Sequence, residues 1–168
     1  MSFLKILFPN EDYNSIYEID YNKLYKKGVR AIIFDIDNTL VMHGVKADEK
    51  IKVFFDKLRS LNINTCLLSN NKKKRVEPFA NDVGSLFIEN AKKPSIKNYL
   101  KALELMNVKK EETIFIGDQL FTDILGAKRA GIYAILVKPI DKKEEIQIVI
   151  KRFFENIVLL SYKKGKGK

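Results

Sequence analysis

Residues 29–40 read Val-Arg-Ala-Ile-Ile-Phe-Asp-Ile-Asp-Asn-Thr-Leu, an apolar run that ends abruptly in two carboxylates. A run so short and so rich in Ile and Phe is typical of a strand that is buried on both faces of a parallel sheet. Four more runs of this kind lie at residues 63–68, 86–88, 113–116 and 132–137. The sequence therefore predicts a sheet of five parallel strands.

Amphipathic stretches separate these runs, and that alternation is typical of strand–helix–strand units. The predicted helices cover residues 48–61, 72–82, 94–107 and 121–130, with Asp48 as an N-cap, Pro94 as a first helical residue and Gly131 as a helix stop. The predicted fold class is α/β, a three-layer Rossmann-like arrangement of a five-stranded parallel sheet with helices on both faces.

A last helix is expected at residues 142–160, and two interpretations of it remain open. Its apolar residues Ile146, Val149, Ile150, Phe153, Ile157 and Leu160 share one face. That spacing is typical of a stripe packed on a core. Further apolar residues widen the stripe, so contact with a membrane interface is the alternative, as it is for the apolar N-terminal residues 3–8. The basic residues 161–168 are expected to form a flexible tail.

Length and composition limit the protein class. The 168 residues suit one compact domain, which we expect to span residues 1–160, with a preamble at 1–28 and a motif-bearing core at 29–139. No apolar run approaches the ~20 residues of a membrane span. A single cysteine, Cys66, excludes an internal disulfide and a Cys-based zinc site, which favours a reducing, cytoplasmic location. The apolar ends of the chain add the expectation of peripheral contact with the inner membrane face.

The chain is strongly basic, with 31 Lys and Arg against 21 Asp and Glu and a formal net charge of +10. Such a surface attracts anions, including nucleic acid, acidic lipid and phosphorylated small molecules. Biased genome composition explains the excess of lysine equally well. A nucleic-acid-binding protein is an alternative, but no nucleic-acid module is recognisable and we expect no nucleic-acid partner.

Polar and charged side chains follow the predicted strands at their carboxyl ends, where parallel sheets bind ligands. Asp35 and Asp37 follow the first strand, and Ser69 follows the second. Lys92 and Lys93 precede a helix after the third strand. Two more carboxylates, Asp118 and Asp123, follow the fourth strand. Clustered carboxylates of this kind suit Mg²⁺, and cations near a helix N-terminus suit a phosphate.

These residues, in this order, resemble the four motifs of the haloacid dehalogenase-like (HAD) phosphatase superfamily: Asp35-Ile-Asp-Asn-Thr39, Ser69, Lys93-Pro94 and Gly117-Asp118 with Asp123. The resemblance implies a phosphomonoesterase in which Asp35 attacks phosphorus and Asp37 acts as acid and base. It also implies a Mg²⁺ site made by the side chains of Asp35 and Asp118, the backbone carbonyl of Asp37, and Asp123.

The same resemblance assigns the phosphate contacts. Ser69 hydrogen-bonds the phosphoryl oxygens and Lys93 neutralises their charge. The expected substrate-binding residues are Thr39, for which turn chemistry alone is the alternative, Asn70, and the basic residues Lys72 and Lys73. For Lys72 and Lys73 the alternatives are a solvated helix face and contact with an anionic membrane.

The short gaps between the motifs leave no room for a cap domain, so the expected enzyme is capless. The finer resemblance is to the class IIIA, YqeG-like group, carried by Asp35-Ile-Asp-Asn-Thr-Leu-Val41, Ser69-Asn-Asn71, Lys93-Pro94 and the run 117–124. It implies phosphatidylglycerophosphate as the substrate and an anionic phospholipid head group as the partner. Soluble phosphate esters, phosphoproteins, nucleic-acid ends and a non-enzymatic phosphoacceptor remain alternatives.

Overall fold

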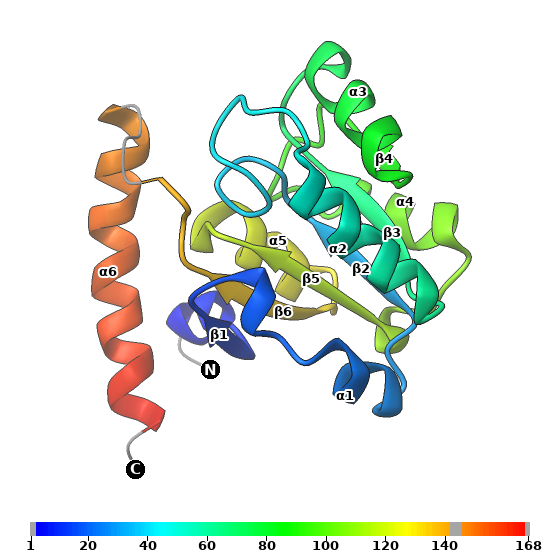
Figure 1. The fold of residues 1–168 in the computed structure, drawn as a ribbon. Helices are drawn as coiled ribbons and strands as arrows, with labels where there is room; N and C mark the ends of the chain where they lie inside the picture. Colours follow the sequence, from blue (N-terminus) through cyan, green and yellow to red (C-terminus); the bar gives the residue numbers. More distant parts are fainter. Residues whose placement is uncertain (1–2, 142–145, 167–168) are drawn as a thin grey trace.

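A computed structural model describes residues 3–141 and 146–166 (Figure 1). At its centre is a six-stranded parallel sheet with the order β1-β6-β5-β2-β3-β4. The strands are β1 (Glu11–Tyr13), β2 (Ala31–Phe34), β3 (Asn64–Leu68), β4 (Leu86–Ile88), β5 (Thr113–Gly117) and β6 (Tyr133–Val137).

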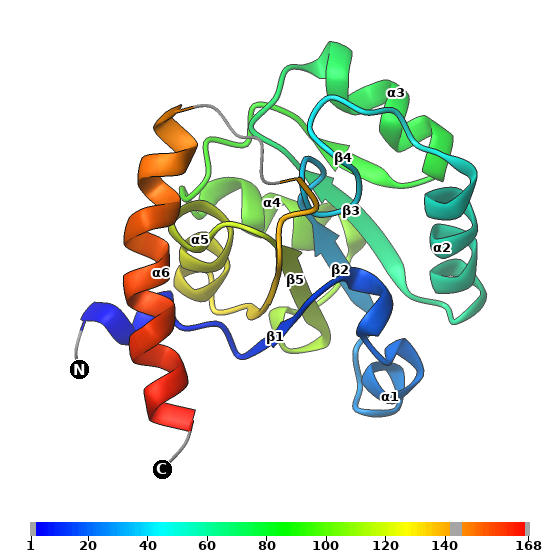
Figure 2. The same cartoon turned by 60° about the vertical axis from the view of Figure 1, so that its left-hand side comes forward.

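Helices cover both faces of this sheet, α2 and α3 on one side and α4 and α5 on the other (Figures 1 and 2). The α-helices are α1 (Tyr21–Lys26), α2 (Glu49–Ser60), α3 (Lys73–Val83), α4 (Lys97–Met106), α5 (Leu125–Arg129) and α6 (Ile146–Lys166). Short 3-10 turns are η1 (Phe3–Leu7), η2 (Ile16–Glu18) and η3 (Lys110–Glu112), and η4 (Leu120–Ile124) is a π-helical turn.

The alternation of side chains along β2 explains the three layers. Ile32 and Phe34 enter the core beneath α2 and α3, whereas Ala31 and Ile33 enter the core beneath α4 and α5. All four are fully buried. Because both faces of a parallel sheet are covered, its strands are continuous apolar runs. The predicted three-layer α/β fold is confirmed, with one strand more than predicted.

The additional strand is β1, which pairs in parallel with β6 at the edge of the sheet. Its sequence, Glu11-Asp12-Tyr13, contains no apolar run. An edge strand needs only backbone hydrogen bonds to one neighbour. Just before β1, the Asn10 N–H donates to the Ala134 carbonyl of β6 at 2.8 Å. Hydrophobic pattern therefore could not reveal it.

Two helix starts differ in outcome. Asp48 is the N-cap of α2, since its carboxylate accepts a hydrogen bond from the Ile51 N–H at 2.9 Å. The prediction that Pro94 begins a helix is wrong: the Lys93–Pro94 peptide is cis and α4 begins at Lys97. The predicted helix at 121–130 is divided into η4 and α5, and Gly131 follows it with a positive φ of 75°.

The prediction that the apolar stripe of the last helix packs on the core is wrong for the side chains that the structure describes. Ile150, Phe153, Ile157 and Leu160 are all at least half exposed. Residues 142–145 and the side chains of Ile146 and Val149 lie outside the described part.

The opposite face of α6 is buried, and polar contacts fix it there. Glu155 accepts a hydrogen bond from the Leu120 N–H at 2.8 Å, at the start of η4. Tyr162 is buried beside Phe8, with ring centroids 5.4 Å apart, and its hydroxyl contacts Asp12 at 3.3 Å. These contacts explain why the helix continues to Lys166, through residues for which the sequence predicts a flexible tail.

Gly126→Ala is expected to destabilise the fold by about 2 kcal/mol or more, since overpacking outweighs the gain in helix propensity. A Cβ at Gly126 would lie 2.4 Å from the ring of Tyr99. Urea unfolding measures the loss. Gly165→Ala is the matched control, because nothing lies within 4 Å of its added Cβ. Equal unfolding midpoints for the two variants would show that the Tyr99 ring moves aside without a cost in stability.

Candidate active site

Parallel strands bring the predicted site residues together at one edge of the sheet. Asp35 follows β2, Ser69 follows β3 and Asp118 follows β5. Backbone bonds continue past the strand ends, with the Asp35 N–H donating to Ile116 and the Ser69 N–H to Ile88, both at 3.0 Å. The carboxyl ends of three strands therefore form one site.

Three carboxylates, those of Asp35, Asp118 and Asp123, have oxygens within 4.8 Å of one another. All three residues are buried. Burial raises the pKa of Asp35 to about 6, and the charge of Asp123 adds to the rise while Lys93 opposes it. Burial, followed by the charges of Asp35 and Asp123, holds the pKa of Asp118 well above its usual range. Buried acids that repel one another fit a divalent cation with oxygen ligands.

Lys93 lies inside this cluster. Its Nζ is 2.6 Å from Asp35 Oδ1 and 2.7 Å from Asp123 Oδ1, and its side chain is only 3% exposed. Burial alone would lower the pKa of Lys93, but Asp123 and Asp35 outweigh it and the pKa is raised. The neighbouring Lys92 is exposed. Of the two lysines, Lys93 is therefore the one whose charge reaches Asp35.

The smaller polar residues frame the same space. Thr39 Oγ1 donates to Asp118 Oδ1 at 3.0 Å and lies 3.4 Å from Asp35 Oδ2. Ser69 is buried, and its hydroxyl accepts a hydrogen bond from a backbone N–H at 3.1 Å. Asn70 Oδ1 accepts from the Lys93 N–H at 2.8 Å. Asn70 therefore contacts the backbone of Lys93, a role that the motif alone does not suggest.

Asp37 is not one of the three clustered carboxylates and has hydrogen-bond partners of its own. Its carboxylate accepts hydrogen bonds from Asn71 Nδ2 at 2.6 Å, Arg75 Nη2 at 2.8 Å and the Gly44 N–H at 2.8 Å. Arg75 also donates to the Val45 carbonyl at 2.8 Å. Arg75 thus joins α3 to the loop after β2, a contact that sequence reasoning missed because Arg75 belongs to the basic run 72–75.

Lys72 and Lys73 lie outside the cluster. Both are exposed at the start of α3, and Lys73 is 3.4 Å from Glu77, one helical turn along. Among the described residues, neither forms an ion pair or a hydrogen bond with the buried carboxylates. They can meet a substrate only from the solvent side.

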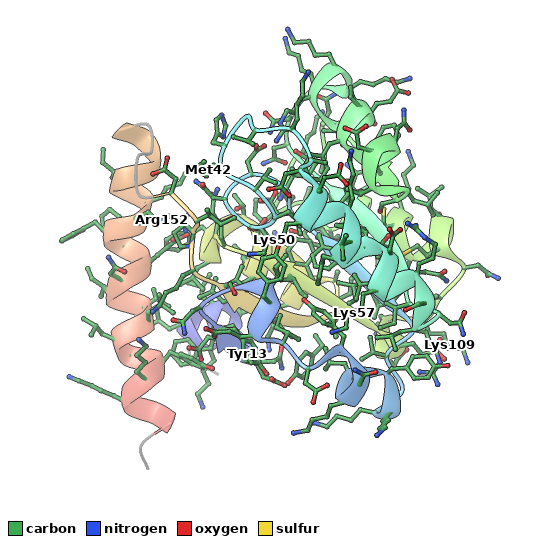
Figure 3. The ribbon with its side chains drawn as sticks, in the orientation of Figure 1. Tyr13, Met42, Lys50, Lys57, Lys109 and Arg152 are labelled. Carbon is green, nitrogen blue, oxygen red and sulfur yellow. The ribbon has the colours of Figure 1, made fainter. Side chains whose placement is uncertain are left out.

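Helix α6 contributes a residue that sequence reasoning did not place in the site. Arg152 reaches from α6 toward the body of the protein (Figure 3) and pairs with Asp118 Oδ2. Its other nitrogen lies 3.0 Å from Glu155 Oε2. The sequence signal is weak: a basic and an acidic residue three positions apart on an apolar helix.

Arg152→Met is expected to lower the free energy of unfolding by about 2–4 kcal/mol, because it leaves two buried carboxylates, Asp118 and Glu155, without their cation. Urea unfolding without divalent cations checks this. Lys151→Met is the control, since it removes the same charge from an exposed neighbour. A loss no greater than in the control would mean that Arg152 holds neither acid.

The comparisons with known proteins agree with this geometry. Residues 43–131 match the haloacid dehalogenase-like hydrolases. A Bacillus subtilis (strain 168) protein described as "Probable phosphatase YqeG" is 35% identical, over 95% of this chain and 94% of its own length. The chloroplastic/mitochondrial phosphatidylglycerophosphate phosphatase 1 of Arabidopsis thaliana is 25% identical, over 86% of this chain and 44% of its own length.

A solved structure shares the fold. It is the cobalt-bound form of the deoxy-D-mannose-octulosonate 8-phosphate phosphatase of Haemophilus influenzae, with a TM-score of 0.51 and 18% identity, covering 84% of this chain and 92% of that one. The sheet order, the acidic strand ends and the match to YqeG along nearly the whole chain lead to one conclusion. The chain belongs to the haloacid dehalogenase-like hydrolases and is a phosphomonoesterase of that family.

Proposed function

We propose that the chain is a Mg²⁺-dependent phosphatase that works through an aspartyl-phosphate on Asp35, with phosphatidylglycerophosphate as its substrate. The observation that carries the chemistry is the buried group of Asp35, Asp118 and Asp123 with Lys93 between two of its members. This combination of clustered acids and one buried amine fits a divalent cation together with a phosphoryl group.

Asp35 is the proposed nucleophile. Lys93 holds its Oδ1, while among the described residues its Oδ2 has one long contact, to Thr39 at 3.4 Å. A carboxylate oxygen of Asp35 forms a bond to phosphorus as the bond from phosphorus to the alcohol oxygen breaks. Ser69 and Lys93 hold the phosphoryl oxygens during this transfer.

Asp37 is the proposed acid and base. It gives a proton to the departing alcohol oxygen and then takes one from the water that cleaves the aspartyl-phosphate, which restores Asp35 and releases inorganic phosphate. In support of this role, Asn71 and Arg75 hydrogen-bond the carboxylate of Asp37, which lies two residues after Asp35 in the chain.

The proposed ligands of Mg²⁺ are the side chains of Asp35, Asp118 and Asp123 and the backbone carbonyl of Asp37. Their oxygens are the ligands that this ion prefers, and in the described part of the chain the three buried carboxylates outnumber the two cations, Lys93 and Arg152, that pair with them. When bound, the ion would neutralise negative charge on the phosphoryl oxygens.

Two observations support the lipid substrate. The Arabidopsis relative named for phosphatidylglycerophosphate aligns with most of this chain. The motifs also have no cap domain inserted between them, because only α2 and β3 lie between Thr39 and Ser69, and only α3 and β4 between Asn71 and Lys93. A site without a cap domain suits a head group that is still part of a membrane. A soluble phosphate ester, a phosphoprotein or a nucleic-acid end is the competing substrate.

Phosphate release from phosphatidylglycerophosphate in mixed micelles, beside a soluble aryl phosphate, tests the proposal. We expect release from the lipid that requires both Mg²⁺ and Asp35, at a much higher rate than from the aryl phosphate. Hydrolysis of the aryl phosphate alone would retain the chemistry and discard the lipid. No release from either substrate would contradict the whole proposal.

Changing Lys72, Lys73 and Lys74 together to Ala is expected to slow hydrolysis in anionic vesicles by roughly 10–100-fold, since each lysine contributes electrostatic attraction to the membrane. Hydrolysis of a soluble ester should change little, because these side chains are exposed and outside the carboxylate cluster. Steady-state rates on both substrates provide the comparison.

The matched control replaces Lys26, Lys27 and Lys109, which are equally exposed but precede β2 and β5 at the opposite edge of the sheet (Figure 3 labels Lys109). This variant should retain the wild-type preference for vesicles. Equal losses on both substrates in the Lys72–Lys74 variant would remove the membrane role of that cluster.

A further inference from the structure

Helix α6 exposes a continuous apolar face to solvent. Phe153 and Phe154 are 64% and 54% exposed, and their rings pack edge to face with centroids 5.7 Å apart. Ile150, Ile157 and Leu160 extend the same face at helical spacing and are 50–62% exposed. Contiguous exposed apolar side chains of this kind are typical of an interaction site.

The body of the protein does not cover this face, because α6 already packs through its other side. Glu155, Val158 and Tyr162 are the buried residues of the described helix. Figures 1 and 2 show α6 at the side of the molecule, outside the two helical layers. The exposed face is therefore available to another surface.

The charges on α6 indicate what that surface is. The exposed charged residues of its described side chains are Lys151, Lys163 and Lys164, all cationic. Its one acid, Glu155, is buried and paired with Arg152. A second copy of the chain docked through this face would bring like charges together, which is unfavourable. An apolar partner with a negative surface fits both features.

Helix length and hydropathy define the geometry. The 21 residues of α6 extend for roughly 30 Å at the usual rise per residue. No helix in the described part of the chain is long and apolar enough to cross a membrane. A helix with phenylalanines on one face and lysines beside them instead lies in the plane of an interface.

We infer that α6 is a membrane-docking helix, which inserts Ile150, Phe153, Phe154, Ile157 and Leu160 into the surface of an anionic phospholipid bilayer. The inference deepens the proposed function and rests on it for its purpose, since a phosphatase acting on a lipid must work at a bilayer. Arg152 of the same helix pairs with Asp118, so the docked helix would hold the active site at the membrane surface.

Vesicle flotation of the full chain tests the inference directly. We expect wild-type protein to float with vesicles of phosphatidylcholine and phosphatidylglycerol, and not with phosphatidylcholine alone. The double variant Phe153→Gln, Phe154→Gln should weaken partitioning at least ~10-fold, since it removes two large apolar side chains from the interface. Lys163→Gln with Lys164→Gln should also weaken flotation, and the binding that remains should depend less on salt.

The matched control is Val53→Gln with Leu105→Gln, two exposed apolar residues on α2 and α4. It should float like wild type, and circular dichroism should show all variants folded. Floating of the Phe153, Phe154 variant at wild-type levels, or no floating of wild type, would overturn the inference. A dimer in sedimentation that the same variant dissociates would assign the face to a second copy instead.

Flotation and hydrolysis test the docking helix and the proposed substrate separately. Flotation without hydrolysis of phosphatidylglycerophosphate would retain the docking helix and discard the substrate. Hydrolysis in micelles by protein that does not float would retain the substrate and discard the docking helix.

Discussion

Asp35→Asn is expected to reduce phosphate release by on the order of 10⁴-fold or more, because it removes the nucleophile of a group that acts as a unit. An amide oxygen is a far weaker nucleophile than a carboxylate oxygen and carries no negative charge to pair with Lys93. The fold should persist, since the substitution keeps the shape of the side chain. Steady-state hydrolysis with saturating Mg²⁺ measures the loss.

Asp56→Asn is the matched control: it alters an exposed aspartate on α2 whose partner is Arg59, and should leave the rate unchanged. A second measurement distinguishes an Asp35 that attacks phosphorus from an Asp35 that only binds the metal. Wild-type protein quenched in acid during turnover should carry a phosphate that hydroxylamine removes, as acyl phosphates do, and the variant should carry none. Turnover by Asp35→Asn at near wild-type rates would refute the covalent route.

The positions of the acids could be predicted because the topology is parallel. Runs that are apolar throughout imply a covered sheet, and a covered parallel sheet places every strand end at one edge. Asp35, Ser69 and Asp118 therefore had to meet. The place of Lys93 followed from its motif, whereas the hydrogen bond from its N–H to Asn70 depends on loop geometry that no spacing reveals.

Contacts between distant segments could not be predicted. Arg75 and Asp37 are 38 positions apart, and Arg152 and Asp118 are 34 apart. Nothing in either local sequence identifies the partner of a charged side chain. Strand β1 was hidden for a related reason, because an edge strand is stabilised by backbone bonds rather than by an apolar pattern.

The orientation of α6 shows the limit of periodicity. Spacing identifies an apolar face on a helix but does not say what covers it. Here the narrower face with Glu155, Val158 and Tyr162 is buried, since Glu155 hydrogen-bonds η4 and Arg152 pairs with Asp118. The broad apolar face is left exposed to solvent.

Lys93→Met is expected to destabilise the metal-free protein by about 3–5 kcal/mol, the usual cost of removing one partner from a buried ion pair. The amine lies within 2.7 Å of both Asp35 and Asp123, and methionine fills similar space without charge. Two neighbouring buried carboxylates then have no balancing cation. Hydrolysis should fall by roughly 10²–10³-fold, since a charge that stabilises the transferring phosphoryl group is lost.

The effect of Mg²⁺ on the melting temperature tests whether the lost stability arises in the three-carboxylate cluster. A divalent cation among Asp35, Asp118 and Asp123 would replace part of the lost charge, so Mg²⁺ should raise the melting temperature of Lys93→Met more than that of wild type. Lys92→Met, which removes an exposed charge one residue away, should behave like wild type with and without Mg²⁺. Equal stabilisation of all three proteins by Mg²⁺ would mean that Lys93 and the cation balance different acids.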